Sequence, residues 1–198
     1  MKLIKRGEPG EEKNNCTSYR FFTGICLVGL IVYKIDSHET EQRHITAQIK
    51  CNTYGERIKN EITNGIAITD TLKQVLISEN GKISQFDTIA ENIMSDVIES
   101  IQLAPDGNVT DIYPSEGTEA SKIDLLQDKD CSKISCYARD NHVIITQGPF
   151  DLKQDGCGIA VRNPVYLKDE NNQEYFWGFT IVILRVPTSD SKDSDRYR

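Results

Sequence analysis

The sequence contains little of what catalysis requires. It has three histidines among 198 residues, and it contains no HExxH, GxSxG or paired CxxC arrangement. A catalytic nucleophile needs a base within hydrogen-bond reach, and a metal ion needs several converging ligands. We therefore expect no enzymatic activity, no metal centre and no cofactor.

Clusters of basic residues are also scarce. Residues 1–35 carry six Lys or Arg against three acidic residues, a net charge of +3, whereas residues 36–198 carry seventeen against twenty-seven, a net charge of -10. Recognition of nucleic-acid phosphates needs clustered cationic side chains. The acidic balance of the longer part therefore argues against nucleic acid as a partner.

One long apolar run is present, at residues 21–33, where Thr23 is the only polar residue and no residue is charged. A bilayer core needs about 20 helical residues, so the run is short. Basic residues precede it and acidic residues follow it, which agrees with the positive-inside rule. We predict a transmembrane signal anchor at residues 21–35, with residues 1–20 in the cytoplasm and the remainder outside. A cleaved signal peptide and a buried helix of a soluble protein are the alternatives.

The segment after this run predicts a long helix over residues 36–78. Asp36 is a suitable N-cap, and Gly65 marks a position where a kink or break is expected. Such a helix can serve as a stalk, or it can pack on its own domain, and the two interpretations are compatible. Its apolar positions lie mostly four residues apart, which gives one apolar stripe: Ile45, Ile49, Ile58, Ile62 and Ile66.

The rest of the chain predicts mainly antiparallel strands, so the expected fold class is α+β. The polar segment at residues 188–198 is predicted to be disordered. The expected elements are a helix at 87–99, a hairpin from 101–104 and 109–113, short helices at 119–126 and 133–141, and strands at 142–146, 158–166 and 175–186.

Five motifs, in their order along the chain, resemble the CHASE domain. They are residues 101–107 (IQLAPDG), 113–117 (YPSEG), 123–126 (IDLL), 147–152 (QGPFDL) and 158–166 (GIAVRNPVY). CHASE domains are extracellular sensors of bacterial histidine kinases, diguanylate cyclases and phosphodiesterases, and of plant cytokinin receptors. The resemblance covers roughly residues 40–187. It implies a long stalk helix and a PAS-like antiparallel sheet whose face and loops hold a small molecule.

The resemblance also suggests ligand-binding residues. It places the acidic anchor of the plant receptors at or near Glu116, and it maps two further contact positions to Thr146 and Asp155. Tyr113 and Phe150 add aromatic surfaces to these polar groups, near several glycines, as a small-molecule pocket requires. A solvated acid at 116 and a structural turn at 149–150 are the alternative interpretation.

The sequence therefore predicts a membrane-anchored, extracytoplasmic sensor domain, residues 36–187, that binds an unidentified small molecule and forms a homodimer through the stalk helix. Typical CHASE proteins continue into an output domain, and we expect none in this chain. The alternative is a dimerising or partner-binding ectodomain without a small ligand.

The disulfide state is left open by the sequence. Four cysteines, Cys51, Cys131, Cys136 and Cys157, fall in the predicted extracytoplasmic part, and they allow three complete pairings. Free thiols are the alternative.

Overall fold

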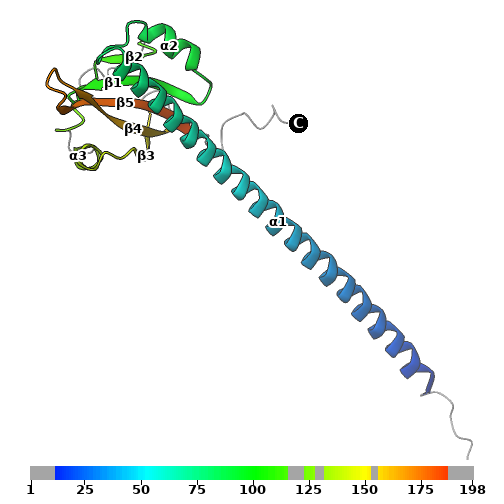
Figure 1. Ribbon diagram of the computed structural model, residues 1–198. Coiled ribbons are helices and arrows are strands. Elements are labelled where there is room, and N and C mark those ends of the chain that lie inside the picture. Colours follow the sequence, from blue (N-terminus) through cyan, green and yellow to red (C-terminus); the bar gives the residue numbers. More distant parts are fainter. Residues whose placement is uncertain (1–11, 116–122, 128–131, 153–155, 187–198) are drawn as a thin grey trace, which may run out of the picture. The chain divides into compact units, whose positions relative to one another are not determined.

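The computed structural model describes residues 12–115, 123–127, 132–152 and 156–186 (Figure 1). The predictions for Cys131 and for the tail at 188–198 lie outside these residues. The chain forms two compact units, Met1–Gly55 and Glu56–Arg198, and each is described by itself.

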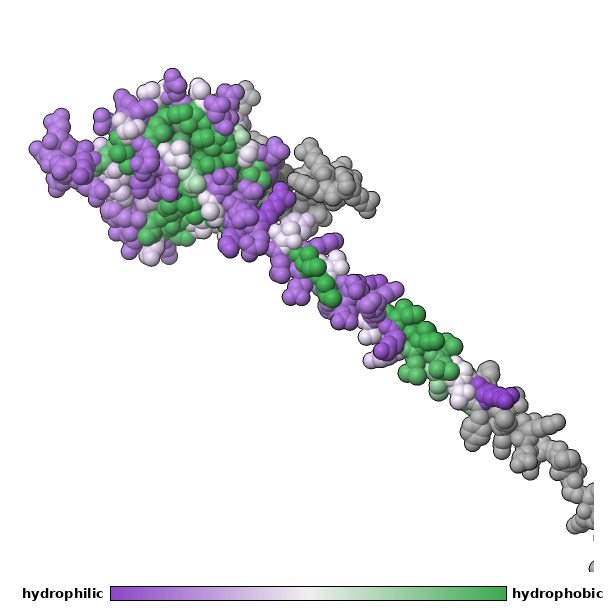
Figure 2. Space-filling view, turned by 45° about the vertical axis from the view of Figure 1, so that its right-hand side comes forward, coloured by the Kyte–Doolittle hydropathy of each residue, from purple (hydrophilic) through white to green (hydrophobic). Residues whose placement is uncertain are grey.

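The described part of the first unit consists of helix α1 (Glu12–Ser78), which continues into the second unit. The apolar side chains of α1 within the first unit are exposed, and Figure 2 shows apolar surface along this part of the helix. They are Phe22, Ile25, Leu27, Val28, Leu30, Ile31, Val32, Tyr33, Ile35, Ile45, Ile49 and Tyr54.

The predicted transmembrane helix at residues 21–35 is wrong. No helix in the part of the chain that the structure describes has a stretch long and apolar enough to cross a membrane. The physical reason lies in the length of the run: residues 21–33 are thirteen residues, and Lys34 and Asp36 follow at once. A bilayer core needs about 20 apolar residues in a helix.

Two further details of α1 differ from expectation. The helix begins at Glu12 rather than at Asp36, and it continues through Gly65. Gly65 lies against the sheet: a Cβ atom at this position would come within 3.2 Å of both Leu184 Cδ1 and Val161 Cγ2. The glycine therefore allows a close approach between helix and sheet instead of interrupting the helix.

The second unit contains a five-stranded antiparallel sheet with the strand order β2-β1-β5-β4-β3. Its strands are β1 (Ile98–Pro105), β2 (Asp111–Tyr113), β3 (Ile145–Asp151), β4 (Cys157–Lys168) and β5 (Glu174–Val186). Two short helices, α2 (Phe86–Ile93) and α3 (Ser132–Asn141), complete the unit. The long helix and the antiparallel sheet were both expected from the sequence.

Two predicted helices are shorter than expected or missing. Helix α2 ends at Ile93, and residues 98 and 99 belong to β1 instead. Of the predicted helix at 119–126, the structure describes residues 123–126, which are not helical: Asp124 forms a bridge and a turn follows at 125–127. The bridge of Asp124 is antiparallel and joins it to Asn108.

One face of the sheet packs against the C-terminal turns of α1 and against α2 (Figure 1), and we call it the α1 face. Leu72 and Leu76 of α1 are fully buried there, and burial of a leucine side chain contributes about 1.5 to 3 kcal/mol. The buried apolar core of this face comprises Ile68, Leu72, Leu76, Phe86, Ala90, Ile98, Ile101, Leu103, Val161, Val165, Leu167, Val182 and Leu184.

Polar side chains also attach α1 to this face. The Thr180 hydroxyl donates to the carbonyl oxygen of Thr69 at 3.0 Å, and the Asn163 amide donates to the carboxylate of Asp70 at 2.7 Å. Both bonds join a residue of the sheet to a residue of α1. They fix the position of the helix along the strands.

The opposite face carries the second core, and we call it the α3 face because α3 contacts β3 and β4 on this side (Figure 1). Its buried apolar residues are Ala104, Val109, Leu125, Ala138, Ala160, Phe179, Ile181 and Ile183.

Candidate functional site

Arg162 lies on the α3 face, in the middle of a mostly apolar strand. On β4 it is directly opposite Ile145 of β3 and Ile181 of β5, and both isoleucines belong to the α3-face core. Residues directly opposite one another in antiparallel strands point to the same side of the sheet. Arg162 is 5% exposed, so a permanently charged guanidinium is buried on this face.

Gln147 is the neighbour of Arg162 on β3. It is paired in register with Ala160, which also belongs to the α3-face core. The Nη1 group of Arg162 donates a hydrogen bond to Oε1 of Gln147. The edge strand β3 and its neighbour β4 are therefore joined by a polar contact on the α3 face.

A second polar pair lies on β1, two strands away from Arg162. Gln102 is opposite Ile181 and Ser100 is opposite Ile183, so both side chains point to the α3 face. Gln102 is 7% exposed and Ser100 is 2% exposed, and Nε2 of Gln102 donates to Oγ of Ser100 at 2.9 Å. The central strand β5 contributes apolar side chains between the two polar groups.

Helix α3 adds a buried hydroxyl above the sheet. Ser135 has no exposed surface, and Ala138, three residues further on and therefore on the same side of the helix, belongs to the α3-face core. Within the described part of the chain the Ser135 hydroxyl has no hydrogen-bond partner. A buried hydroxyl without a partner costs about 1 to 3 kcal/mol, so Ser135 is an unusual choice for a purely structural position.

Tyr166 of β4 holds the C-terminal end of α3. Its hydroxyl donates to the carbonyl oxygen of Arg139, and its ring stacks on His142 with the ring centres 3.9 Å apart and the planes at 2°. Burial raises the pKa of Tyr166, so the phenol stays protonated and able to donate. Tyr166 also meets Phe176 edge to face at 5.7 Å.

The structure separates the predicted site residues that it describes. Tyr113, on β2, packs against the α1-face core, whereas Phe150, on β3, packs against the α3-face core. These strands form opposite edges of the sheet. Thr146, also on β3, is exposed. Glu116 and Asp155 lie outside the described residues.

The buried polar residues of the α3 face were not selected from the sequence, although a signal existed for two of them. Arg162 is the only charged residue in the run GIAVRNPVY, which the sequence predicts as a strand. Ser100 and Gln102 alternate with Ile101 and Leu103, which is the pattern of a strand with two different faces. Ser135 gave no signal, because its burial depends on how α3 packs.

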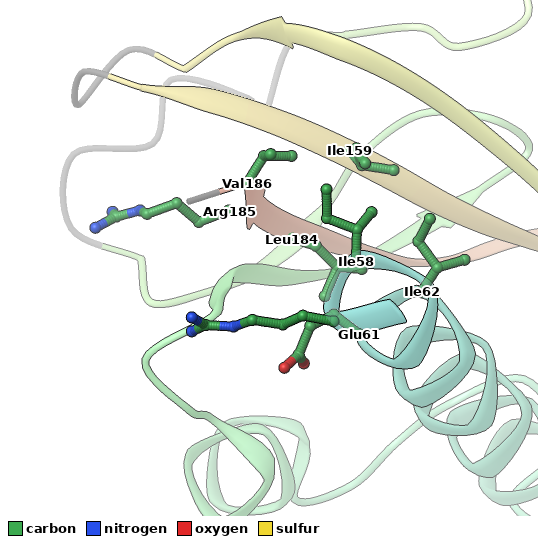
Figure 3. A pocket seen from close by; sticks show the side chains of 8 residues that line it. Ile58, Glu61, Ile62, Ile159, Leu184, Arg185 and Val186 are labelled. Atoms are coloured by element: carbon green, nitrogen blue, oxygen red, sulfur yellow. The ribbon is translucent and has the colours of Figure 1, made fainter. Parts of the chain in front are cut away.

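A separate hollow lies where α1 meets the end of the sheet (Figure 3), and its volume is about 10 Å³. This space holds about one water molecule, whereas sites for metabolites measure about 300 to 1,000 Å³. It is therefore a packing defect rather than a binding site. Its lining residues are Arg57, Ile58, Glu61, Ile62, Ile159, Leu184, Arg185 and Val186.

Metal ligands do not gather in the described residues: no group of three or more His, Cys, Asp or Glu side chains there could hold an ion. Cys51, Cys136 and Cys157 are free thiols, as is Cys26. The candidate site is thus the α3 face, where one cation, two hydroxyls and two amides are placed on an apolar background.

No family model and no curated protein matches the sequence. Among solved structures, the chain is similar to an extracellular ligand binding receptor from Desulfohalobium retbaense DSM5692, with 13% sequence identity and a TM-score of 0.49. The similarity covers 66% of this chain and 23% of the receptor, so the chain spans less than a quarter of that receptor's length. A likeness of this size carries no argument about function.

Proposed function

We propose that this chain is a sensor domain that works outside the cytoplasm, binds a small molecule on the α3 face and performs no chemistry of its own. The observation that carries the proposal is the set of buried polar side chains on that face. Arg162, Gln102 and Ser135 come from three different elements and are all buried, and Ser135 has no partner in the described residues. Small-molecule sites combine apolar walls with a few well-placed polar groups.

The motif resemblance supports the same proposal from the sequence. We propose that residues 36–187 form a CHASE-like domain, in which a long helix leads into an antiparallel sheet that receives the ligand. The long α1 and the five-stranded sheet are the elements that such a domain needs. The proposed contacts are then those of the α3 face, which carries Phe150 but not Tyr113.

The full chain provides the test. It is screened by thermal unfolding against a library of small metabolites, and the purified protein is examined by native mass spectrometry for a retained compound. A ligand at one hundred times its dissociation constant adds about 2.7 kcal/mol to the free energy of unfolding. A library that leaves the melting temperature unchanged, together with protein that carries no compound, would contradict the proposal.

A second candidate function rests on the exposed apolar residues of α1. Ile45 and Ile49, four residues apart, are 45% and 60% exposed, and an apolar stripe of this kind can pair two copies of a helix. Association through α1 would make the chain a dimerising module, with or without a ligand. Analytical ultracentrifugation over a range of concentrations measures it.

The variant pair Ile45→Ser and Ile49→Ser is expected to shift the chain toward the monomer. Ile77→Ser, at a position that is 42% exposed on the same helix, is the matched control and should leave association unchanged. Monomeric wild-type chain at all concentrations would remove this second candidate.

A further inference from the structure

Five exposed apolar residues of α1 in the first unit share one heptad register. In such a register, the residues that face a second helix recur at alternating steps of three and four. Every isoleucine between residues 26 and 55 occupies one of these positions, and each of the five side chains is 45% to 61% exposed, so a second molecule can reach it. The five are Val28, Ile31, Ile35, Ile45 and Ile49; together with His38 and Gln42, which occupy the intervening positions of the register, we call them the α1 seam.

The two polar residues of the α1 seam restrict how two copies can be aligned. His38 lies three residues after Ile35, and Gln42 lies three residues before Ile45. A polar residue at such a position fixes the alignment of two helices, because it is disfavoured opposite an apolar side chain. In a parallel pair without stagger, Gln42 faces Gln42 of the second copy and each isoleucine faces an isoleucine. A shift by one heptad would instead place Gln42 against Ile35 or Ile49.

The charges beside the α1 seam favour a parallel second copy. Lys34 and Glu39 flank the seam on opposite sides and are five residues apart, which is the separation at which flanking residues of two parallel helices meet. Lys34 of one copy then lies beside Glu39 of the other. Glu39 also lies 3.7 Å from Arg43 of its own helix, but its side chain is 64% exposed and can be reached by a second copy.

The antiparallel alternative brings like charges together. An antiparallel pair that matches Ile35 with Ile45 of the second copy has its two-fold axis at residue 40. It therefore gathers Glu39 and Glu41 of both copies around that axis. Like charges brought together across an interface oppose association. Charge complementarity thus selects the parallel direction, and the polar residues of the seam select the alignment without stagger.

We propose that a second copy of this chain packs along the α1 seam, residues 28–49, as a parallel coiled coil without stagger. Gln42 sets the alignment, and contacts between Lys34 and Glu39 of different copies set the direction. This inference rests on the second candidate function, association through α1, and names the partner surface and its geometry.

Sedimentation equilibrium of the full chain at low ionic strength measures the dissociation constant. Lys34→Glu should weaken association about tenfold, because it replaces opposite-charge contacts between copies by like-charge contacts. The double variant Lys34→Glu with Glu39→Lys should recover most of the affinity, since the opposite-charge contacts return in reversed order. Lys50→Glu, at an exposed position outside the seam, is the matched control and should associate normally.

Gln42→Ile tests the alignment of the α1 seam. It replaces the polar residue by one that matches the neighbouring isoleucines, so it should tighten association about tenfold or more. Thr40→Ile adds the same side chain at an exposed position on the outer side of the helix and should leave the dissociation constant unchanged. Equal effects of Gln42→Ile and Thr40→Ile would overturn the assignment of the seam.

The outcomes separate this inference from the function on which it rests. If Lys34→Glu associates like the wild-type chain, or if Glu39→Lys does not rescue it, the parallel direction is wrong. If the variant pair Ile45→Ser and Ile49→Ser is monomeric while Lys34→Glu and Gln42→Ile behave like the wild type, association through α1 stands and the proposed geometry fails. A wild-type chain that is monomeric at all concentrations would remove both.

Discussion

The two faces of the sheet bury polar side chains in different ways. On the α1 face, Thr180 and Asn163 each bond to a residue of α1, so every such contact attaches the helix to the sheet. On the α3 face, Arg162 bonds to Gln147 on the neighbouring strand, and Ser135 on α3 reaches no partner among the described residues. The described polar contacts of the α1 face thus join a helix to the sheet, whereas the described contact of Arg162 on the α3 face joins two strands.

Two adjacent residues of β4 allow the two faces to be compared directly. Arg162 and Asn163 are neighbours in sequence, both are buried, and they point to opposite faces. Substitutions at the two positions should therefore separate loss of stability from loss of binding.

The largest effect is expected at the apolar core of the α1 face. Leu72→Ala removes a fully buried side chain between α1 and the sheet, and should lower the free energy of unfolding by about 2 to 5 kcal/mol. Leu27→Ala, at a position 60% exposed on the same helix, should change it little. Urea unfolding followed by circular dichroism measures both. Equal effects of the two substitutions would mean that α1 does not pack on the sheet as described.

Asn163→Ala should have the next largest effect. It removes the amide that donates to the carboxylate of Asp70 at 2.7 Å, and hydrogen bonds to charged groups contribute about 1.5 to 3 kcal/mol. Asn52→Ala, at an exposed position of α1, is the control. Ligand binding by Asn163→Ala at a temperature where it is folded should match that of the wild-type chain. If Asn163→Ala weakened ligand binding but did not lower the free energy of unfolding, Asn163 would not have the structural role assigned to the α1 face.

Removal of one hydroxyl from each face should give effects of opposite sign. Thr180→Val keeps the shape of the side chain but deletes the donor to the Thr69 carbonyl, so it should cost about 0.5 to 1.5 kcal/mol. Ser135→Ala deletes a hydroxyl without a partner and should cost nothing or stabilise. Thr146→Val, at an exposed position of β3, controls for the methyl replacement. Similar losses for Thr180→Val and Ser135→Ala would show that the Ser135 hydroxyl is structural.

The smallest effect is expected in the turn that follows α1. Hydrogen bonds from the backbone N–H and the hydroxyl of Ser84, at 2.7 and 2.8 Å, hold the pKa of the Glu79 carboxylate below its ordinary value of 4.5. A lowered pKa in the folded state stabilises the chain above the unfolded pKa, and this contribution is lost as the pH falls.

The stability difference between the wild-type chain and Glu79→Gln should therefore be constant above about pH 4.5 and shrink below it. Glu91→Gln, at an exposed position of α2, is the control and should show no such change. Thermal unfolding between pH 3 and pH 7 checks the prediction. If the difference in unfolding free energy between the wild-type chain and Glu79→Gln grew as the pH fell, the lowered pKa of Glu79 would be contradicted.

The sequence was most informative where local pattern decides structure. The predicted strands at 158–166 and 175–186 correspond to β4 and β5, because a polar loop separates two apolar runs. It was least informative at residues 94–99, where Val97 and Ile98 also fit the helical spacing of the preceding residues. Pairing of Ile98 with Leu184 places that segment in the sheet, and this contact is distant in sequence.

The candidate site was harder to foresee because it depends on strand order. Tyr113 and Phe150 look like neighbours of one pocket in the motif order, but β1, β5 and β4 lie between their strands. Arg162 could have been chosen, since a single charge in an apolar strand needs a reason. The apolar run at 21–33 led to a wrong prediction. Its composition suggested a membrane span, but the run is too short to be one.

The central position of β5 has a consequence for synthesis of the chain. β5 follows the other four described strands in sequence, yet it pairs with both β1 and β4 and so joins two otherwise separate halves of the sheet. Until residues 174–186 leave the ribosome, the inner edges of β1 and β4 expose backbone groups that can pair with other chains. The nascent polypeptide therefore depends on β5 to protect β1 and β4, and a pause in translation shortly before Glu174 should favour aggregation.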